Sequence, residues 1–401
     1  MRLVIIGAGF AGMYAALSAA RLRDIKGVPP SDLEIMLVSP EPTLVVRPRL
    51  YEPNPDTLTA PLQDVLDAID AVYVRGRADS IDTACRTVVI EGLGGERTSL
   101  IYDRLVVASG SRLFRPDLPG IGEHTYSVDQ RDDAIALDRH LQSLASRPAS
   151  QARNTVIVAG AGFTGIEVAT EMPARLSAVL GQNATVRVIM VERNDTVAPD
   201  MGPGPRPVIE DALQKLGVES RTGVGVAAVD ENGVTLSTGE RIPSETVIWA
   251  AGMRAAPLTQ QIPGERDNFG RLVVDRELRV TGVPGVFATG DAAKAVCDDD
   301  GNHALMSCQH ATRMGAFAGN NAAAELLGVA PIPYHQKAYV TCLDLGEAGA
   351  LFTRGWDRKI EHVGADAKKI KQEINTVWIY PPKPVRAAAL ASADPQRVTD
   401  L

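Results

Sequence analysis

Residues 3–17 read LVIIGAGFAGMYAAL, and the same pattern returns 153 residues later, where residues 156–170 read VIVAGAGFTGIEVAT. Each copy has a run of mostly β-branched residues, then G-A-G-F-x-G, then a stretch typical of a helix start. A second apolar stretch follows each copy, at residues 33–39 and 186–192. A strand, a glycine turn, a helix and a further strand make a βαβ unit, so the sequence predicts an α/β fold with two such units.

The glycines of the repeated turn have separate roles. The first permits a tight turn, the second lets the backbone approach a pyrophosphate, and the third lets helix and strand pack closely. These positions are Gly7, Gly9 and Gly12 in the first copy and Gly160, Gly162 and Gly165 in the second. The helix that follows presents free N–H groups and a positive dipole end to the phosphates. The repeat therefore predicts two Rossmann-like dinucleotide-binding domains and two bound dinucleotides.

The residue that ends the second strand of each unit decides which ribose fits. In the second copy this residue is Glu192, whose carboxylate can accept hydrogen bonds from both ribose hydroxyls and repels a 2′-phosphate. The second unit is therefore expected to bind NADH in preference to NADPH. In the first copy the position is Ser39, which can make one such bond, with Glu41 as an alternative partner.

The composition excludes several other classes of protein. The chain has 41 Lys and Arg against 49 Asp and Glu, and its pI near 5.4 argues against nucleic acid as the partner. The four cysteines contain no C-x-x-C pair, and the acidic stretch 298–302 lacks the glutamate of a calcium loop, so no metal is expected. Residues 3–20 are uncharged like a signal peptide, but their glycine pattern favours a buried strand and helix. We therefore expect a cytoplasmic protein with reduced thiols and no membrane span.

A third motif points to a flavin. Residues 285–292 read GVFATGDA, a short strand followed by Thr-Gly-Asp and an expected helix. This motif resembles the second FAD signature of the two-dinucleotide flavoproteins, the pyridine nucleotide-disulfide oxidoreductase superfamily, in which Asp291 would hold the ribityl hydroxyls. Residues 106–110 (VVASG) and 248–252 (IWAAG) resemble the turns at which the chain leaves each nucleotide domain of that superfamily.

Within the superfamily, residues 1–380 resemble type II NADH dehydrogenase, an NADH:quinone oxidoreductase. The segments that carry the resemblance are GFTGIEVATE at 162–171, RPRLYE at 47–52, MSCQHA at 306–311 and INTVWIYPP at 374–382. The resemblance implies hydride transfer from NADH to FAD, followed by electron transfer to a quinone or quinone-like acceptor. Cys308 and Arg313 stand where the family usually has Ala and a second Gln. The amphipathic C-terminal helices of the family are missing, which implies at most peripheral membrane contact.

The resemblance also implies roles for individual side chains. Glu167 is the candidate for an acid/base or positioning role beside nicotinamide and flavin. Gln309 and His310 are the catalytic candidates on the acceptor side, where an amide can bond a quinone carbonyl and a histidine can deliver a proton. The residues assigned to FAD are Gly7, Gly9, Phe10, Ala11, Gly12, Ser39, Arg47, Ala78, Ser109, Gly110, Asp291 and Gln309, and those assigned to NAD(H) are Gly160, Gly162, Thr164, Gly165, Glu192 and Gly252.

The order of the motifs predicts a discontinuous arrangement of domains. The FAD-binding domain is expected to comprise residues 1–112 and 255–330, with the NAD(H)-binding domain, residues 113–254, inserted between them. Alternating segments beyond residue 331 predict a small C-terminal α+β domain (331–401) that caps the flavin and offers a homodimer surface. We expect its last ~15 residues to be disordered. The basic run KKIK at 368–371 is expected on a solvated helix face.

Other functions fit the same motifs. The chain can be an FAD-dependent enzyme for a specialised small metabolite, with NAD(H) as its redox partner. It can also be a flavoprotein sensor that binds NAD(H) without turnover. Thiol chemistry at Cys308, as in sulfide:quinone oxidoreductases, is a further alternative, but no cysteine lies between Cys85 and Cys297 to supply the usual partner.

Overall fold

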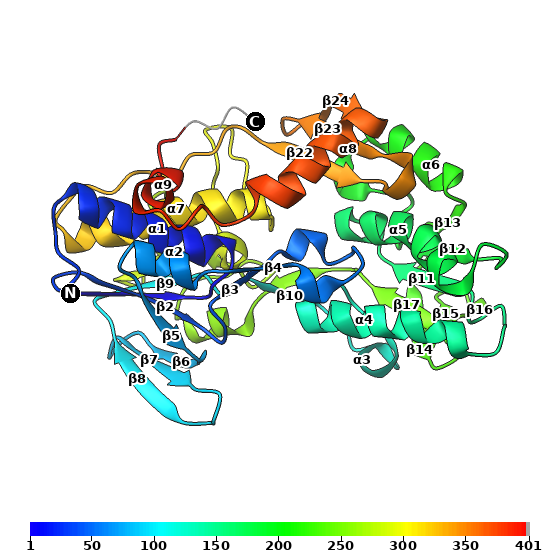
Figure 1. Ribbon diagram of the computed structural model, residues 1–401, viewed down its shortest axis with the longest axis horizontal. Helices are drawn as coiled ribbons and strands as arrows, with labels where there is room; N and C mark the ends of the chain where they lie inside the picture. The colour runs from blue at the N-terminus through cyan, green and yellow to red at the C-terminus, as the bar shows by residue number, and fades with distance from the viewer. Residues whose placement is uncertain (398–401) are drawn as a thin grey trace.

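The structure is a computed structural model that describes residues 1–397, and two parallel sheets form its centre (Figure 1). The first sheet has the order β20-β9-β1-β2-β5, built from β1 (Arg2–Ile6), β2 (Glu34–Ser39), β5 (Val72–Arg75), β9 (Arg104–Val107) and β20 (Val286–Ala288). The second has the order β13-β12-β11-β17, built from β11 (Thr155–Ala159), β12 (Arg187–Val191), β13 (Val218–Arg221) and β17 (Thr246–Trp249). The predicted α/β class with two Rossmann-like units is confirmed.

In both sheets the glycine turn joins the central strand to a long helix. β1 leads into α1 (Phe10–Ile25), and β11 leads into α5 (Phe163–Leu180). The uncharged N-terminal stretch is thus a buried strand and helix, as predicted. The remaining helices before the C-terminal part are α2 (Gln63–Ala68), α3 (Ile121–His124), α4 (Arg131–Ser143), α6 (Arg206–Lys215) and α7 (Cys308–Leu326).

Small sheets complete the chain, and all but the parallel pair β19 (Leu272–Val273) and β21 (Ala293–Lys294) are antiparallel in the described residues. Two of them are excursions from the parallel sheets: β6 (Arg77–Asp82), β7 (Thr87–Glu91) and β8 (Arg97–Ile101) in the first unit, and β14 (Val226–Asp230), β15 (Gly233–Leu236) and β16 (Arg241–Pro243) in the second. β10 (Ser111–Leu113) pairs with β18 (Met253–Ala255) where the chain passes between the units. After residue 331, β22 (Val340–Asp344), β23 (Ala350–Arg354) and β24 (Lys359–Val363) pack with α8 (Gly364–Glu373). This is the predicted small α+β part.

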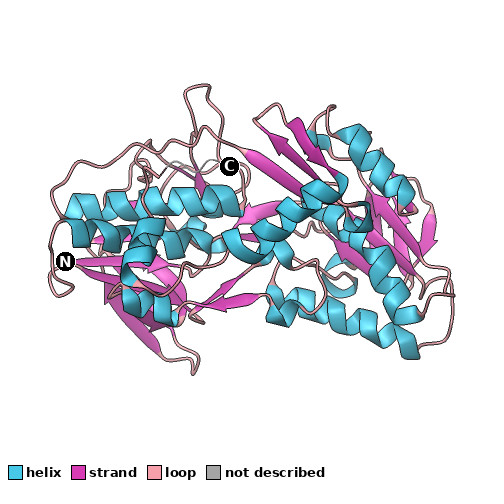
Figure 2. Ribbon diagram, turned by 45° about the horizontal axis from the view of Figure 1, so that its top comes forward, coloured by secondary structure: helices cyan, strands magenta, loops and turns pink. Residues whose placement is uncertain are grey.

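Helices α1 and α7 lie side by side at backbone contact (Figure 2). A Cβ added at Gly315 would lie 2.2 Å from the carbonyl oxygen of Ala11, and one added at Gly319 would lie 1.9 Å from that of Ala15. Because both contacts advance by four residues in the same direction, the two helices run parallel, with their N-termini at the same end. A side chain at either glycine would separate them.

The C-terminal segment returns to the first unit. We expected a disordered tail, but α9 (Arg386–Ser392) packs Ala389 and Leu390 into the core of the first unit, next to α1 and α2 (Figure 1). Arg386 donates hydrogen bonds to Asp24 and Asp70. The tail is ordered because these contacts bury apolar surface and pair its charges; its last residues, 398–401, lie outside the described residues. Among residues 1–397, no helix is long and apolar enough to cross a membrane.

Gly319→Ala tests the contact between α1 and α7. We expect the added methyl group to lower the free energy of unfolding by about 1–3 kcal/mol, because it meets backbone rather than a movable side chain. Chemical denaturation followed by circular dichroism measures the change. Gly122→Ala is the matched control, since an added Cβ meets nothing within 4 Å there. Equal stability of the Gly319→Ala variant and the wild type would contradict the proposed contact.

Candidate functional site

The first glycine turn leaves a helix N-terminus open. Gly7 has a φ of 108°, and a Cβ added at Gly12 would lie 1.8 Å from the carbonyl oxygen of Gly7, so both positions require glycine. Gly9 precedes α1 in an extended conformation without a side-chain cap. Nothing lies within 4 Å of a Cβ added there. The N–H groups of the first turn, which begins with Phe10 and Ala11, are therefore available to a pyrophosphate.

The second turn repeats this geometry. Gly160 has a φ of 109°, and a Cβ added at Gly165 would lie 1.9 Å from the carbonyl oxygen of Gly160. Gly162 precedes α5 in the same extended conformation, again without a side-chain cap. Thr164, in the first turn of α5, is exposed. Gly252, which follows β17, has a φ of 82°. The turn and helix start form a second open anion site.

The turn at 106–110, the Thr-Gly-Asp turn and the first residues of α7 meet at the first glycine turn, and together they fit a flavin dinucleotide. Gly290 of the Thr-Gly-Asp turn packs between α1 and α7: a Cβ there would lie 2.8 Å from Cβ of Ala11 and 3.4 Å from Cβ of Ala311. The hydroxyls of Ser109 and Thr289 are buried nearby without a hydrogen-bond partner among the described residues. Buried polar groups normally have hydrogen-bond partners, so these two unpaired hydroxyls indicate a polar ligand. The positive N-terminal ends of two parallel helices suit an anionic one.

Arg47 and Asp291, which the motifs place in two separate segments, lie together. Nη1 of Arg47 is 3.6 Å from Oδ2 of Asp291, and the hydroxyl of Ser111 donates to the same oxygen at 2.6 Å. Asp129, from the second unit, accepts a hydrogen bond from Nη2 of Arg47 at 2.6 Å. Ser111 directly follows the predicted turn at 106–110, but no sequence motif marks Asp129, so only the structure identifies Asp129 as a partner of Arg47.

The other residues assigned to FAD are less directly placed. The hydroxyl of Ser39 donates to the backbone carbonyl of Glu41 at 2.6 Å, so it is engaged locally. The Glu41 side chain is exposed and pairs with Arg131. Ala78 lies on β6, in register with Ile90 of β7. Of these residues, Glu41 has the side chain most exposed to solvent.

Glu192 is fixed against the second glycine turn. Its Oε2 accepts from the backbone N–H of Ala161 at 2.8 Å, and its Oε1 accepts from the backbone N–H and side-chain amide of Asn194 at 2.8 and 2.6 Å. The carboxylate is buried at the end of β12, next to the turn. These bonds hold the carboxylate beside the second glycine turn.

Glu167 forms a buried ion pair with Lys371 of α8. Oε1 of Glu167 accepts from Nζ of Lys371 at 2.7 Å and from the backbone N–H of Asp344 at 3.1 Å. Both side chains of the ion pair are almost fully buried. Within residues 1–397 no hydrogen bond engages Oε2, so the carboxyl has one anchored oxygen and one free oxygen. The basic run 368–371 is thus not a purely solvated face, because the fold turns Lys371 inward.

The environment of Glu167 suits proton exchange. Burial raises the pKa of Glu167 to about 7, although the ammonium group of Lys371 acts in the opposite direction. A carboxyl with a pKa near neutrality can both hold and release a proton at the working pH. Sequence reasoning missed the role of Lys371, because its partner lies 204 positions away and the basic run 368–371 is typical of a solvated helix face.

The N-terminus of α7 carries the predicted acceptor-side residues. Oε1 of Gln309 accepts from the backbone N–H of Val340 at 3.4 Å. His310 is fully buried, and its ring packs against Tyr339 and Trp356 at centroid distances of 5.2 and 5.9 Å. Burial lowers the pKa of His310 to about 4, so its ring is neutral at pH 7. The Gln309 side chain is therefore partly exposed, whereas the His310 side chain is fully buried.

The cysteines do not form a reactive pair in the described part of the chain. All four thiols are free, and burial raises the pKa of Cys308 and Cys342 to about 11 and 12. A thiol is nucleophilic as the thiolate, which these values disfavour. Residues 1–397 also contain no cluster of three or more His, Cys, Asp or Glu side chains that could hold a metal ion.

Known proteins resemble the chain along nearly its whole length. Residues 1–315 match the family described as pyridine nucleotide-disulphide oxidoreductase. An NADH dehydrogenase-like protein of Mycobacterium tuberculosis is 48% identical over 98% of both chains. A type II NADH:quinone oxidoreductase of the same organism is 31% identical over 73% of this chain and 67% of its own length. The structure of NDH2 from Plasmodium falciparum in complex with NADH superposes with a TM-score of 0.79 at 15% identity, covering 98% of this chain and 97% of that one.

Glu192→Ala tests the nucleotide preference of the second turn. We expect binding of NADH to weaken about tenfold, because hydrogen bonds to a charged group are lost, while binding of NADPH changes less. Titration of the flavin-loaded protein with each nucleotide under anaerobic conditions measures both affinities. Arg193→Ala, at the exposed neighbouring position, is the control. An unchanged ratio of the two affinities would remove Glu192 from the ribose site.

Proposed function

The chain belongs to the pyridine nucleotide-disulphide oxidoreductase family, and we propose that it is an FAD-dependent NADH dehydrogenase that passes electrons to a quinone. One observation carries this proposal: two βαβ units in one chain each present an uncapped helix N-terminus behind a glycine turn. Two such sites hold two dinucleotides, one resident and one exchangeable. The names of the relatives support NADH as donor and a quinone as acceptor.

We assign FAD to the first turn and to the segments that meet it. The N–H groups that begin α1 would hold the pyrophosphate, and Arg47, Ser109 and Asp291 would hold polar groups of the flavin side. When bound, FAD supplies the hydride and electron chemistry that amino-acid side chains lack. The protein residues bind it, orient it and complement its charge, since helix N-termini favour developing negative charge.

We assign NADH to the second turn. Glu192 is held beside that turn and would accept hydrogen bonds from ribose hydroxyls, while its charge disfavours the 2′-phosphate of NADPH. Thr164 is exposed at the helix start, where its hydroxyl can reach a phosphate. Both assignments, like the role of Gly252, rest on the position of these residues around the turn.

Glu167 is our candidate for the group that holds or delivers a proton beside the reacting atoms. Its Oε1 is anchored by Lys371 and by the backbone of Asp344, which leaves Oε2 for a substrate. Reduction of a quinone to a quinol consumes protons as well as electrons, and a carboxyl that titrates near pH 7 can supply them. The amide of Gln309 can donate a hydrogen bond to a carbonyl of the acceptor. His310, at the same end of α7, is the second candidate for a catalytic residue on the acceptor side.

We propose that residues 1–112 and 255–330 form the FAD-binding domain and that residues 113–254 form the NAD(H)-binding domain, because β10 and β18 pair close to these boundaries. We further propose a homodimer and a cytoplasmic location. Size-exclusion chromatography with light scattering tests the first of these, and cell fractionation tests the second.

Anaerobic mixing of the FAD-loaded protein with NADH tests the proposed function. We expect the absorbance of oxidised flavin to bleach and then to recover on addition of a soluble quinone. Recovery with quinone but not with sulfur compounds supports the proposal over thiol chemistry. A flavin that stays oxidised in NADH would overturn it and favour a different substrate or a sensor.

Glu167→Gln separates the two halves of the reaction. We expect quinone-dependent reoxidation of the flavin to slow about 100-fold, since general acid catalysis typically contributes at least that much, while reduction by NADH slows less. Stopped-flow absorbance measures each half separately. Glu171→Gln, one helical turn further along α5, is the matched control and should stay within a few-fold of the wild type. Equal slowing in both variants would argue against a proton-transfer role for Glu167.

A further inference from the structure

The last residue of β22, Asp344, holds the anchored oxygen of Glu167 in place. Its backbone N–H donates to Oε1 of Glu167 at 3.1 Å. Its own carboxylate, which is buried, is bonded from three directions: by the hydroxyl of Tyr51 at 3.1 Å, by Nζ of Lys368 at 2.5 Å and by the backbone N–H of Gly346 at 2.9 Å. The position of Asp344, and therefore of its peptide group, is fixed by this set of donors.

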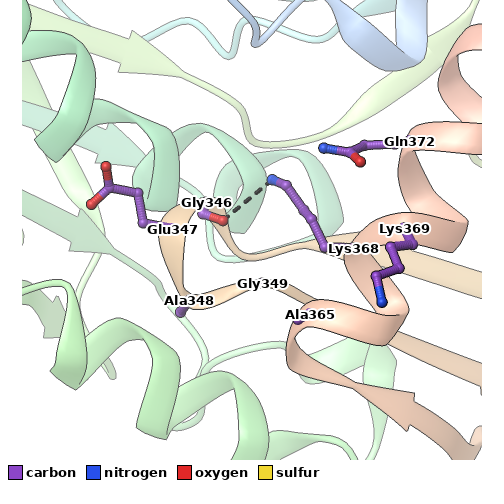
Figure 3. A pocket seen from close by; sticks show the side chains of 8 residues that line it. All are labelled: Gly346, Glu347, Ala348, Gly349, Ala365, Lys368, Lys369 and Gln372. Carbon is purple, nitrogen blue, oxygen red and sulfur yellow. Dashed lines mark hydrogen bonds between the residues drawn. The ribbon is translucent and has the colours of Figure 1, made fainter.

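Lys368 connects this buried carboxylate with solvent. Its side chain is 26% exposed and lines an open pocket of about 490 Å³ between α8 and the turn Gly346–Ala348. Figure 3 shows its amino group reaching the carbonyl oxygen of Gly346, at 3.2 Å. Nζ also lies 4.0 Å from Oε1 of Glu171. Lys369 lines the same pocket, but its side chain is 77% exposed and, within residues 1–397, forms an ion pair with Asp366 alone.

Charges of both signs surround Glu167. The titratable groups that interact with Glu167 directly are Lys371 of α8, Asp344 and Cys342 of β22 and Tyr51 of the loop after Arg49. Lys368 of α8 and Glu171 of α5 interact with Asp344. Lys371 lowers the pKa of Glu167, and the charge of the Asp344 carboxylate raises it, while the hydrogen bond from the backbone N–H of Asp344 lowers it. Lys368 is the counter-ion of Asp344, so it decides how much of the negative charge of Asp344 acts on Glu167.

We propose that Asp344 and Lys368 are positioning residues that set the protonation of Glu167, so that a lysine at the protein surface controls a carboxyl buried in the candidate site. The inference deepens the proposed function, because it concerns the residue to which that function assigns the proton. It does not depend on turnover, because the ionisation of Glu167 can be followed in the resting protein.

The arrangement requires opposite effects from its two members. Lys368→Met removes a positive charge and leaves Asp344 uncompensated, so the pKa of Glu167 rises. Asp344→Asn removes the negative charge but keeps the shape and the peptide N–H, so the pKa of Glu167 falls. We expect each shift to be about one pH unit, the effect of one charge at close range in a partly buried site. General damage to the fold would move both variants in the same direction.

Infrared difference spectroscopy of the FAD-loaded protein measures the pKa directly. The carboxyl band of protonated Glu167 is identified as the band that is lost in Glu167→Gln, and its intensity is followed against pH. Lys368→Met should move the midpoint up and Asp344→Asn should move it down. Lys368→Arg keeps the charge and should restore the wild-type midpoint, and Lys369→Met, in the same pocket, should not move it.

The outcomes separate this inference from the proposed function. Opposite shifts support the inference even if no quinone is ever reduced, in which case only the proposed function falls. An unmoved midpoint in Lys368→Met overturns the inference, and so does an equal shift in Lys368→Arg. If Asp344→Asn does not fold, the comparison of Lys368→Met with Lys368→Arg decides the question alone.

Discussion

The backbone contact between α1 and α7 determines the geometry of the whole first unit. Gly315 and Gly319 let the two helices approach until carbonyl oxygens of α1 occupy the space of a side chain on α7. Parallel packing at this distance brings both N-terminal ends to one place, and Gly290 of the Thr-Gly-Asp turn fits between them. The positive ends of two dipoles and a set of unpaired donors then surround the same volume. The packing of the two helices alone therefore creates a place suited to an anionic flavin dinucleotide.

A buried ion pair determines which segments surround Glu167. Glu167 enters the interior on α5 and costs free energy there unless a cation accompanies it. Lys371 supplies that cation from the far end of the chain, which obliges α8 to lie against the second unit. Arg175 of α5 donates to the backbone of Tyr51 and pairs with Asp138, so the loop after Arg49 is bound to the second unit as well. The units are thus joined by charged groups that each need a partner, rather than by apolar packing alone.

The sequence predicts the parts of this protein that depend on local spacing. Both glycine turns, their helices and the parallel pairing of β1 with β2 and of β11 with β12 follow from the repeat, because each feature is set by residues within about 30 positions of one another, as in any βαβ unit. The partners of Glu167, Arg47 and Asp291 do not follow, since Lys371 and Asp129 come from distant segments without a motif. The sequence also does not predict the ordered C-terminal helix α9. Its polar, proline-containing surroundings read as a loop, and only the surface of α1 and α2 makes helix formation favourable.

The discontinuity of the first unit has a consequence for biosynthesis. The second sheet is complete once residue 249 has been made, because β11, β12, β13 and β17 all lie within residues 155–249. The first sheet lacks β20 until residue 288, and α1 lacks its partner α7 until residue 326. Because the chain leaves the ribosome N-terminus first, the sheet of the second unit is complete before the sheet of the first unit. During that interval the edge of β9 that later pairs with β20, and the face of α1 that later packs on α7, have no partner in the chain made so far.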